Sequence, residues 1–227
     1  MKAKVGKTYL SVPHEKGERT FQHPSFRGNY AAITEAIKKS GLRMPSSSET
    51  ASLIYDSFKN PKGEYESQII SLLKNSWCLE ATGNLYLPKS NEEVNNGVIL
   101  DLNPEFKNGR LSMDKNSLMK RLQKGDDFVK FVPFGFKTGV QKTSELEKNP
   151  YIQARYGEEG AQKIAQIASK HKLNPGLWSF DSVEEEIKRV AGLYSNYFDD
   201  RLVVDTFISG DFDYGFSFGV SEMNKGK

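Results

Sequence analysis

The chain has 227 residues, which is long enough to bury a core, and its 37% hydrophobic and 27% charged residues are typical of a folded globular protein. Its formal net charge is only +3, with basic and acidic residues interleaved, so we expect no nucleic-acid partner. The single cysteine, Cys78, excludes an intramolecular disulfide, and the three histidines lie too far apart in sequence for a zinc motif. We therefore expect neither a metal nor another cofactor.

The sequence contains no apolar stretch long enough for a signal peptide or a membrane span. We expect synthesis in the cytoplasm, with display on a virion or cell surface requiring another route. Glycine and proline are scattered along the chain, without an internal repeat or a low-complexity linker. This pattern predicts a single domain over residues 1–227.

The sequence of the first half of the chain predicts two or three helices. Asn29 is a capping residue before the first helix, and Gly41 supplies its stop. Ser46 and Glu49 have the spacing of a capping box, which predicts the start of the second helix. The third helix is indicated by an apolar stripe of Tyr65, Ile69, Leu72 and Leu73.

Strands and further helices are expected to complete a mixed architecture. Short apolar runs bounded by turn residues predict strands at Tyr9–Val12, Leu85–Leu87, Val98–Leu100 and Phe128–Phe136. Helical spacing of apolar residues predicts helices at Ser117–Lys124 and Glu158–Lys170. Another helical turn or two is expected from Ser182 through Ile187 to Val190, with Glu184, Glu185 and Glu186 in its first turn.

The C-terminal segment from Val190 to Ser221 has an unusual composition. It contains no Lys, Glu, Gln, Met or Trp, although these residue types are common elsewhere in the chain. It is instead rich in tyrosine, phenylalanine and aspartate. Buried strands account for few charges but not for several aspartates, and tyrosine-rich surfaces are typical of adaptable binding sites. The composition therefore favours a binding surface.

The five missing types are those that an asparagine codon cannot become when its adenines are randomised and its third base stays a pyrimidine. The segment therefore resembles the C-terminal variable region of target proteins of diversity-generating retroelements. Those proteins have a C-type lectin fold that closes in a strand of the form Gly-Phe-Arg-x-Ala-Leu. This chain has Gly215-Phe216-Ser217-Phe218-Gly219-Val220 at the corresponding place, with serine at the arginine position.

A second point of resemblance lies before the second expected helix. The run from Gly41 to Glu49 is similar to the Arg-Leu-Pro-Thr-x-x-Glu loop in the formylglycine-generating branch of the same fold. The resemblance implies an α+β protein, with a C-type lectin-like fold carrying helical and strand insertions. Formylglycine-generating enzymes use a cysteine pair, which this chain lacks, and the Glu-Pro-Asn and Trp-Asn-Asp calcium motifs of lectins are absent.

Three hypotheses for function follow from these observations. The first is a non-enzymatic display protein that binds a protein or cell-surface ligand through residues 190–221. The second is a hydrolase or transferase that uses aspartates such as Asp211 and Asp213 in a cleft. The third is an aromatic-rich closing hairpin without a site. A reverse transcriptase gene and a near-identical template repeat beside the gene would favour the first.

The display hypothesis predicts which residues of the segment face a ligand. The alternation of Phe216, Phe218 and Val220 assigns these three side chains to the core face of the final strand. The other aromatic and polar positions form the candidate ligand-facing set, which comprises Tyr194, Asn196, Tyr197, Asp199, Asp200, Val203, Asp205, Phe207, Ser209, Asp211, Phe212, Asp213 and Tyr214.

Overall fold

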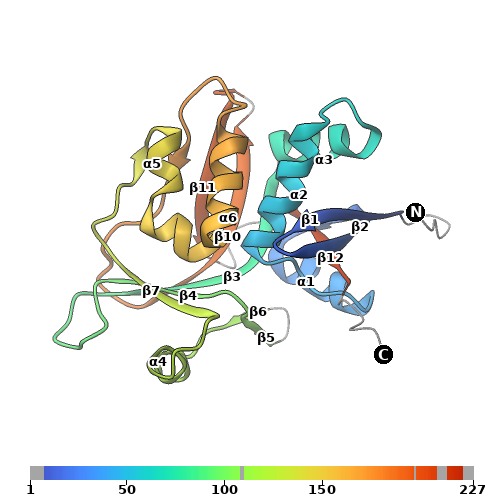
Figure 1. Ribbon diagram of the computed structural model, residues 1–227. Helices are drawn as coiled ribbons and strands as arrows, with labels where there is room; N and C mark the ends of the chain where they lie inside the picture. The colour runs from blue at the N-terminus through green and yellow to red at the C-terminus, as the bar shows by residue number, and fades with distance from the viewer. Residues whose placement is uncertain (1–7, 108–109, 197, 209–213, 222–227) are drawn as a thin grey trace.

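The computed structural model describes residues 8–107, 110–196, 198–208 and 214–221 (Figure 1). A large sheet has the strand order β1-β2-β12-β3-β10-β11-β9-β8, with β4 paired to β3 and β7 paired to β4. A separate hairpin is formed by β5 and β6. The strands are β1 Thr8–His14, β2 Gly17–Gly28, β3 Trp77–Leu87, β4 Gly97–Asp101, β5 Glu105–Lys107, β6 Arg110–Ser112, β7 Val129–Pro133, β8 Gly139–Val140, β9 Gly176–Leu177, β10 Ile187–Asn196, β11 Arg201–Ile208 and β12 Gly215–Val220.

Strand β3 is the centre of the sheet. Antiparallel β10 pairs along one of its edges. The other edge is shared, because parallel β12 pairs with Trp77 and Cys78, whereas antiparallel β4 pairs with Gly83 through Leu87. Strand β12, near the end of the chain, also pairs with β2, near its start, so these two strands lie side by side (Figure 1).

The helices are α1 Tyr30–Lys39, α2 Ser47–Lys59, α3 Glu64–Asn75, α4 Lys115–Gln123, α5 Thr143–Glu147 and α6 Pro150–Ala168. Both predicted caps are confirmed. The Asn29 side chain accepts a hydrogen bond from the Ala32 N–H, and Ser46 forms a capping box with Glu49 at the start of α2. Polar signals that act within one helical turn therefore determine where α1 and α2 begin.

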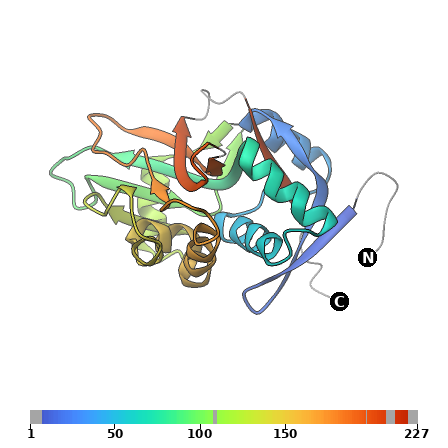
Figure 2. The ribbon, with the colours of Figure 1, turned by 90° about the horizontal axis from the view of Figure 1, so that it is seen from above.

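The helices cover both faces of β3, which explains why this strand is buried along nearly all its length. Helices α2 and α6 lie side by side in both ribbon views (Figures 1 and 2), and their apolar residues share one core with Cys78 and Tyr86. Residues that alternate with these, including Leu79 and Leu85, face a second core with α1. The sheet is therefore the middle layer between two groups of helices.

One expectation about the elements is wrong. The stretch after Ser182 is not helical, because from Ile187 onward it forms strand β10, in register with β3. The three glutamates before it precede a strand and do not occupy the first turn of a helix. Helix α6 consists of two helical segments that meet at Gly157, whose φ is 70°; the predicted helix from Glu158 is the second of them, and the first, from Pro150, was not predicted.

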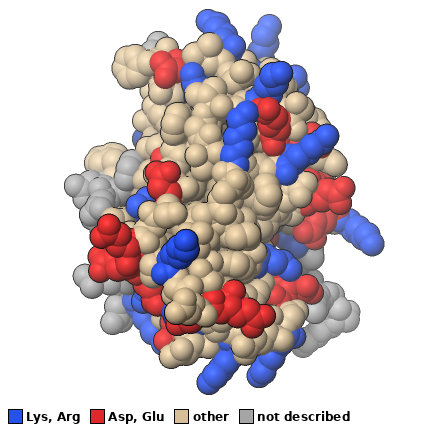
Figure 3. Space-filling view, turned by 90° about the vertical axis from the view of Figure 1, so that its left-hand side faces the viewer, with Lys and Arg blue, Asp and Glu red and all other residues tan. Residues whose placement is uncertain are grey.

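Charged side chains are spread over the surface. On the face in Figure 3, acidic and basic residues are intermixed beside a broad neutral area. Several basic residues form ion pairs with nearby acidic residues. Arg121, for example, donates hydrogen bonds to Asp101 and Asp126. Among the residues that the structure describes, no helix is both long and apolar enough to cross a membrane.

Candidate functional site

The compositionally unusual segment folds into two different parts. Its first part is the antiparallel hairpin of β10 and β11, and its second is the closing strand β12. In the hairpin, Leu193, Leu202 and Val204 belong to the core. The opposite hairpin face is more open, because Tyr194 and Phe207 are only half-buried there. Only one face of the hairpin, and not the whole segment, is therefore open to solvent.

Pairing in the hairpin places five predicted residues on that open face. Tyr194 is opposite Val203, and Gly192 is opposite Asp205, so side chains at every second position point to the same side. We call this surface the outer hairpin face. The predicted residues on it are Tyr194, Asn196, Val203, Asp205 and Phe207.

The predicted ligand-facing residues differ widely in exposure. Tyr214 is 76% exposed, and Asp199 is exposed at the tip of the hairpin, with Asp200 half-buried beside it. The prediction is wrong for Val203, because its side chain is only 8% exposed and therefore does not face a ligand. Phe198 is not in the predicted set, although its side chain is 91% exposed.

Five members of the predicted set lie outside the described residues. They are Tyr197, Ser209, Asp211, Phe212 and Asp213. The two aspartates proposed for a hydrolase or transferase cleft, Asp211 and Asp213, are among them. Neither the display role of these five residues nor that catalytic role is therefore tested by the structure.

Two polar residues of the set have clear local partners. Asn196 accepts a hydrogen bond from the backbone N–H of Phe198 at 2.9 Å, which fixes the backbone at the hairpin tip. The Asp205 carboxylate accepts from the Thr206 N–H at 2.7 Å. Burial raises the pKa of Asp205, and its hydrogen bond with Ser179 opposes that rise. Both side chains therefore contribute to the scaffold.

Trp77 is an aromatic residue of this site that the sequence reasoning assigned no role. It stands at the start of β3, and its indole lies 4.9 Å from the Tyr194 ring and 4.5 Å from the Phe207 ring, measured between centroids. A Cβ atom at Gly192 would lie 2.5 Å from Phe207 Cε2 and 3.3 Å from Trp77 Cε3. Because Gly192 has no side chain, it leaves room for the Trp77 and Phe207 rings to lie across strand β10.

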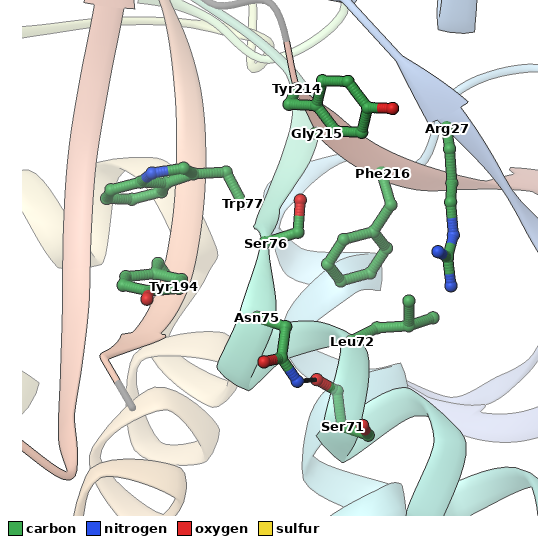
Figure 4. Close-up of a pocket in the computed structure, with 10 residues that line it drawn as sticks. All are labelled: Arg27, Ser71, Leu72, Asn75, Ser76, Trp77, Tyr194, Tyr214, Gly215 and Phe216. Atoms are coloured by element: carbon green, nitrogen blue, oxygen red, sulfur yellow. Dashed lines mark hydrogen bonds between the residues drawn. The ribbon is translucent and has the colours of Figure 1, made fainter. Parts of the chain in front are cut away.

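A hollow of about 530 Å³ adjoins this aromatic cluster. Figure 4 shows Trp77 and Tyr194 on one side of it and Tyr214 and Arg27 on the other, with Phe216 between them. The end of α3 closes the hollow with Ser71, Leu72, Asn75 and Ser76. Aromatic walls with a few polar groups are typical of ligand-binding hollows.

A fully buried ion pair supports the hairpin from beneath. Arg155 of α6 donates to Glu80 of β3 at 2.6 Å, with both side chains at 0% exposure. The same guanidinium donates to the carbonyl oxygens of Gly192, at 3.1 Å, and Asp205, at 3.2 Å. Burial alone would lower the pKa of Arg155, but Glu80 raises it above its usual value. Arg155 therefore holds β10 and β11 against the scaffold as a permanent cation.

A larger hollow, of about 920 Å³, lies elsewhere, between α1, the start of α2 and the loop after β4. Its main charged groups satisfy one another, since Arg19 and Arg43 both donate to the Glu49 carboxylate. Burial would raise the pKa of Glu49, but the bonds from Arg43 and Ser46 hold it at about 2. These contacts build the loop before α2 and leave that carboxylate paired.

Within the part of the chain that the structure describes, no group of three or more His, Cys, Asp or Glu side chains is arranged to hold a metal ion. Burial raises the pKa of the Cys78 thiol well above its usual range, so this cysteine is a buried core residue.

The fold matches that of a solved structure. A C-type lectin fold protein of Nanoarchaeota, described as accommodating massive sequence variation, superimposes with a TM-score of 0.57 at 18% identity. The match covers 86% of this chain and 97% of that one. No family model matches the chain, and no curated protein matches it significantly. The chain therefore has a C-type lectin fold, as predicted, within an α+β architecture.

Proposed function

We propose that the chain is a non-enzymatic ligand-binding protein whose segment 190–221 is diversified by a retroelement. Its ligand is a protein or a cell-surface molecule, bound through the outer hairpin face and the neighbouring hollow. The observation that carries this proposal is a coincidence of composition and geometry. The segment that lacks Lys, Glu, Gln, Met and Trp also supplies Tyr194, Phe207 and Tyr214 to the rim of that site.

The architecture supports a division between scaffold and display. Arg155 reaches the hairpin through backbone carbonyl oxygens, which are present whatever side chains occupy positions 192 and 205. Trp77 and the end of α3 lie outside the segment and provide a fixed wall. Side chains on the open side can therefore change while the backbone stays in place. The similar protein of Nanoarchaeota, which accommodates massive sequence variation, has the same fold.

Two tests address this proposal. Sequencing the DNA around the gene is expected to reveal a reverse transcriptase gene and a template repeat with asparagine codons at the positions of Tyr194, Asp199 and Tyr214. A second test is a surface-displayed library with positions 194, 198, 199, 207 and 214 randomised to the products of such codons. Most members should remain protease-resistant, and panning against immobilised proteins should yield binders.

A matched control library randomises five buried positions outside the segment, namely Ile33, Leu53, Leu85, Ile99 and Ile164. Most of its members should be degraded, because each position is in the core. The proposal is wrong if the two libraries lose protease resistance equally, since the candidate positions would then be needed for folding.

A further inference from the structure

The hollow beside Trp77 adjoins a second hollow of about 430 Å³. The two share three lining residues, Arg27, Ser71 and Leu72. The second one extends along α3 toward His23, past Ser67 and Gln68. We call the combined depression the Arg27 trough. It runs between α3 and β2, and its aromatic end lies at the outer hairpin face.

The trough has an unbalanced charge. Among the residues that the structure describes, neither hollow is lined by an aspartate or a glutamate. Arg27 is exposed and, among the residues that the structure describes, makes no ion pair and no side-chain hydrogen bond. Burial lowers the pKa of His23, which favours the neutral imidazole, and Glu64 opposes that shift. In the described lining, one uncompensated guanidinium therefore stands midway along the trough.

We infer that the Arg27 trough binds an extended, acidic peptide segment of a protein partner; this rests on the proposed function and specifies its ligand. A carboxylate of the peptide accepts two parallel hydrogen bonds from the Arg27 guanidinium, whose planar fork matches carboxylate geometry. A neighbouring apolar side chain enters the hollow beside Trp77 and Tyr194. The ligand is thus recognised by charge at one point and by aromatic contact at the next.

The walls of the trough favour a peptide over a carbohydrate. Sugars bind aromatic residues through a bare ring face, but the Trp77 indole is already contacted by Tyr194 and Phe207. Hydroxyl and amide side chains of Ser67, Gln68 and Ser76 are spaced along the trough, where they meet the polar backbone of an extended chain. Two adjoining hollows also accommodate successive side chains of one segment.

The test uses fluorescent seven-residue peptide pools with one central residue and mixed Leu, Phe, Tyr and Val flanks. The central residue is Glu, Gln or Lys, and binding is measured by fluorescence polarisation. The wild-type chain should prefer the Glu pool. Arg27→Gln should weaken binding of that pool about 3- to 10-fold, and Arg27→Lys should weaken it less. Lys89→Gln removes one exposed charge in the β3–β4 loop and should change nothing.

Several results would overturn the inference. Equal binding of the Glu and Gln pools, no binding of the Glu pool at millimolar concentration, or an unchanged preference in Arg27→Gln would each do so. Arg27-dependent binding of polygalacturonate without binding of the Glu pool would replace the peptide with an acidic glycan.

Failure of the proposed function gives a different result. If Tyr194→Ser and Tyr214→Ser abolish binding of all the pools while Arg27→Gln has no effect, the trough is wrong and the display surface stands. If the two tyrosine variants fold and leave binding of every pool unchanged while Arg27→Gln weakens binding of the Glu pool, the display surface is wrong and the charge contact at Arg27 stands.

Discussion

The two parts of the segment 190–221 share one composition but differ in their surroundings. Every residue of β12, from Gly215 to Val220, is buried, whereas the outer hairpin face remains open around Tyr194 and Phe207. The faces of β12 are covered, because Phe216, Phe218 and Val220 belong to the core and Ser217 donates to the Leu79 carbonyl oxygen at 2.8 Å. What packs on each face of a strand, and not composition, therefore decides which residues of the segment are open to solvent.

The sharpest contrast is between Phe216 and Tyr214, which lie only two positions apart. Phe216→Ala and Phe218→Ala should each lower the free energy of unfolding by about 3 to 5 kcal/mol, because both rings are at most 1% exposed. Tyr214→Ala should change it by less than about 0.5 kcal/mol. Urea denaturation of the three variants measures this difference, and equal losses would refute the distinction between the two parts.

The buried ion pair should be nearly as important to stability. Arg155→Met leaves the Glu80 carboxylate unpaired in the core and should cost about 3 to 5 kcal/mol. Arg27→Met, the same change at an exposed arginine, should cost less than about 0.5 kcal/mol. Thermal unfolding of the two variants measures both losses of stability. A mild effect of Arg155→Met would mean that the hairpin does not depend on this pair.

The stability that Glu49 contributes, through Arg43, to strand β12 should depend on pH. It binds the Arg43 guanidinium, and the Arg43 backbone pairs with Val220 of β12. Because the pKa of Glu49 falls from 4.5 to about 2 on folding, its contribution is complete above pH 4.5 and is lost as the pH falls toward 2. Glu49→Gln should cost about 1 to 3 kcal/mol at pH 7.

The measurement is urea unfolding of the wild-type chain and Glu49→Gln at several pH values. The difference between the two proteins should shrink steadily below pH 4.5. A difference that stays constant down to pH 2.5 would contradict the assigned role of this carboxylate.

Gly192 tests the aromatic cluster on the outer hairpin face. Gly192→Ala places a Cβ within 2.5 Å of Phe207, so the ring must move, at a cost of about 1 to 3 kcal/mol. Gly17→Ala is the control, because an added Cβ there meets no atom within 4 Å. Trp77 contacts Phe207, so its fluorescence should change in the first variant only. Identical spectra would show that the rings do not depend on Gly192.

Sequence reasoning succeeded where the signal was local. The caps at Asn29 and Ser46 act within one helical turn, and the buried apolar residues of β12 alternate as expected. It failed after Ser182, because Val183, Ile187 and Val190 have helical spacing although pairing with β3 makes the region a strand. Long-range pairing overrode a local pattern at that point.

The candidate site was only partly predictable for the same reason. Its aromatic residues Tyr194 and Tyr214 were found through composition, but Trp77 and Arg27 come from distant strands that only the sheet brings together. Val203 was assigned wrongly, although it lies in the apolar run Leu202-Val203-Val204, whose side chains are all buried. No sequence signal near Arg27 indicates that it lies in a trough.

The central claim is that the open side of the segment can change while the fold remains. The most direct test is the thermal unfolding of a quadruple variant, Tyr194→Ser, Phe198→Ser, Asp199→Asn and Tyr214→Ser, beside Phe216→Ala. Each exposed change should alter stability by less than about 0.5 kcal/mol, and Tyr194, being half-buried, by about 1 kcal/mol. The account predicts a folded quadruple variant with a cooperative transition and a strongly destabilised Phe216→Ala. An unfolded quadruple variant beside a stable Phe216→Ala would contradict it.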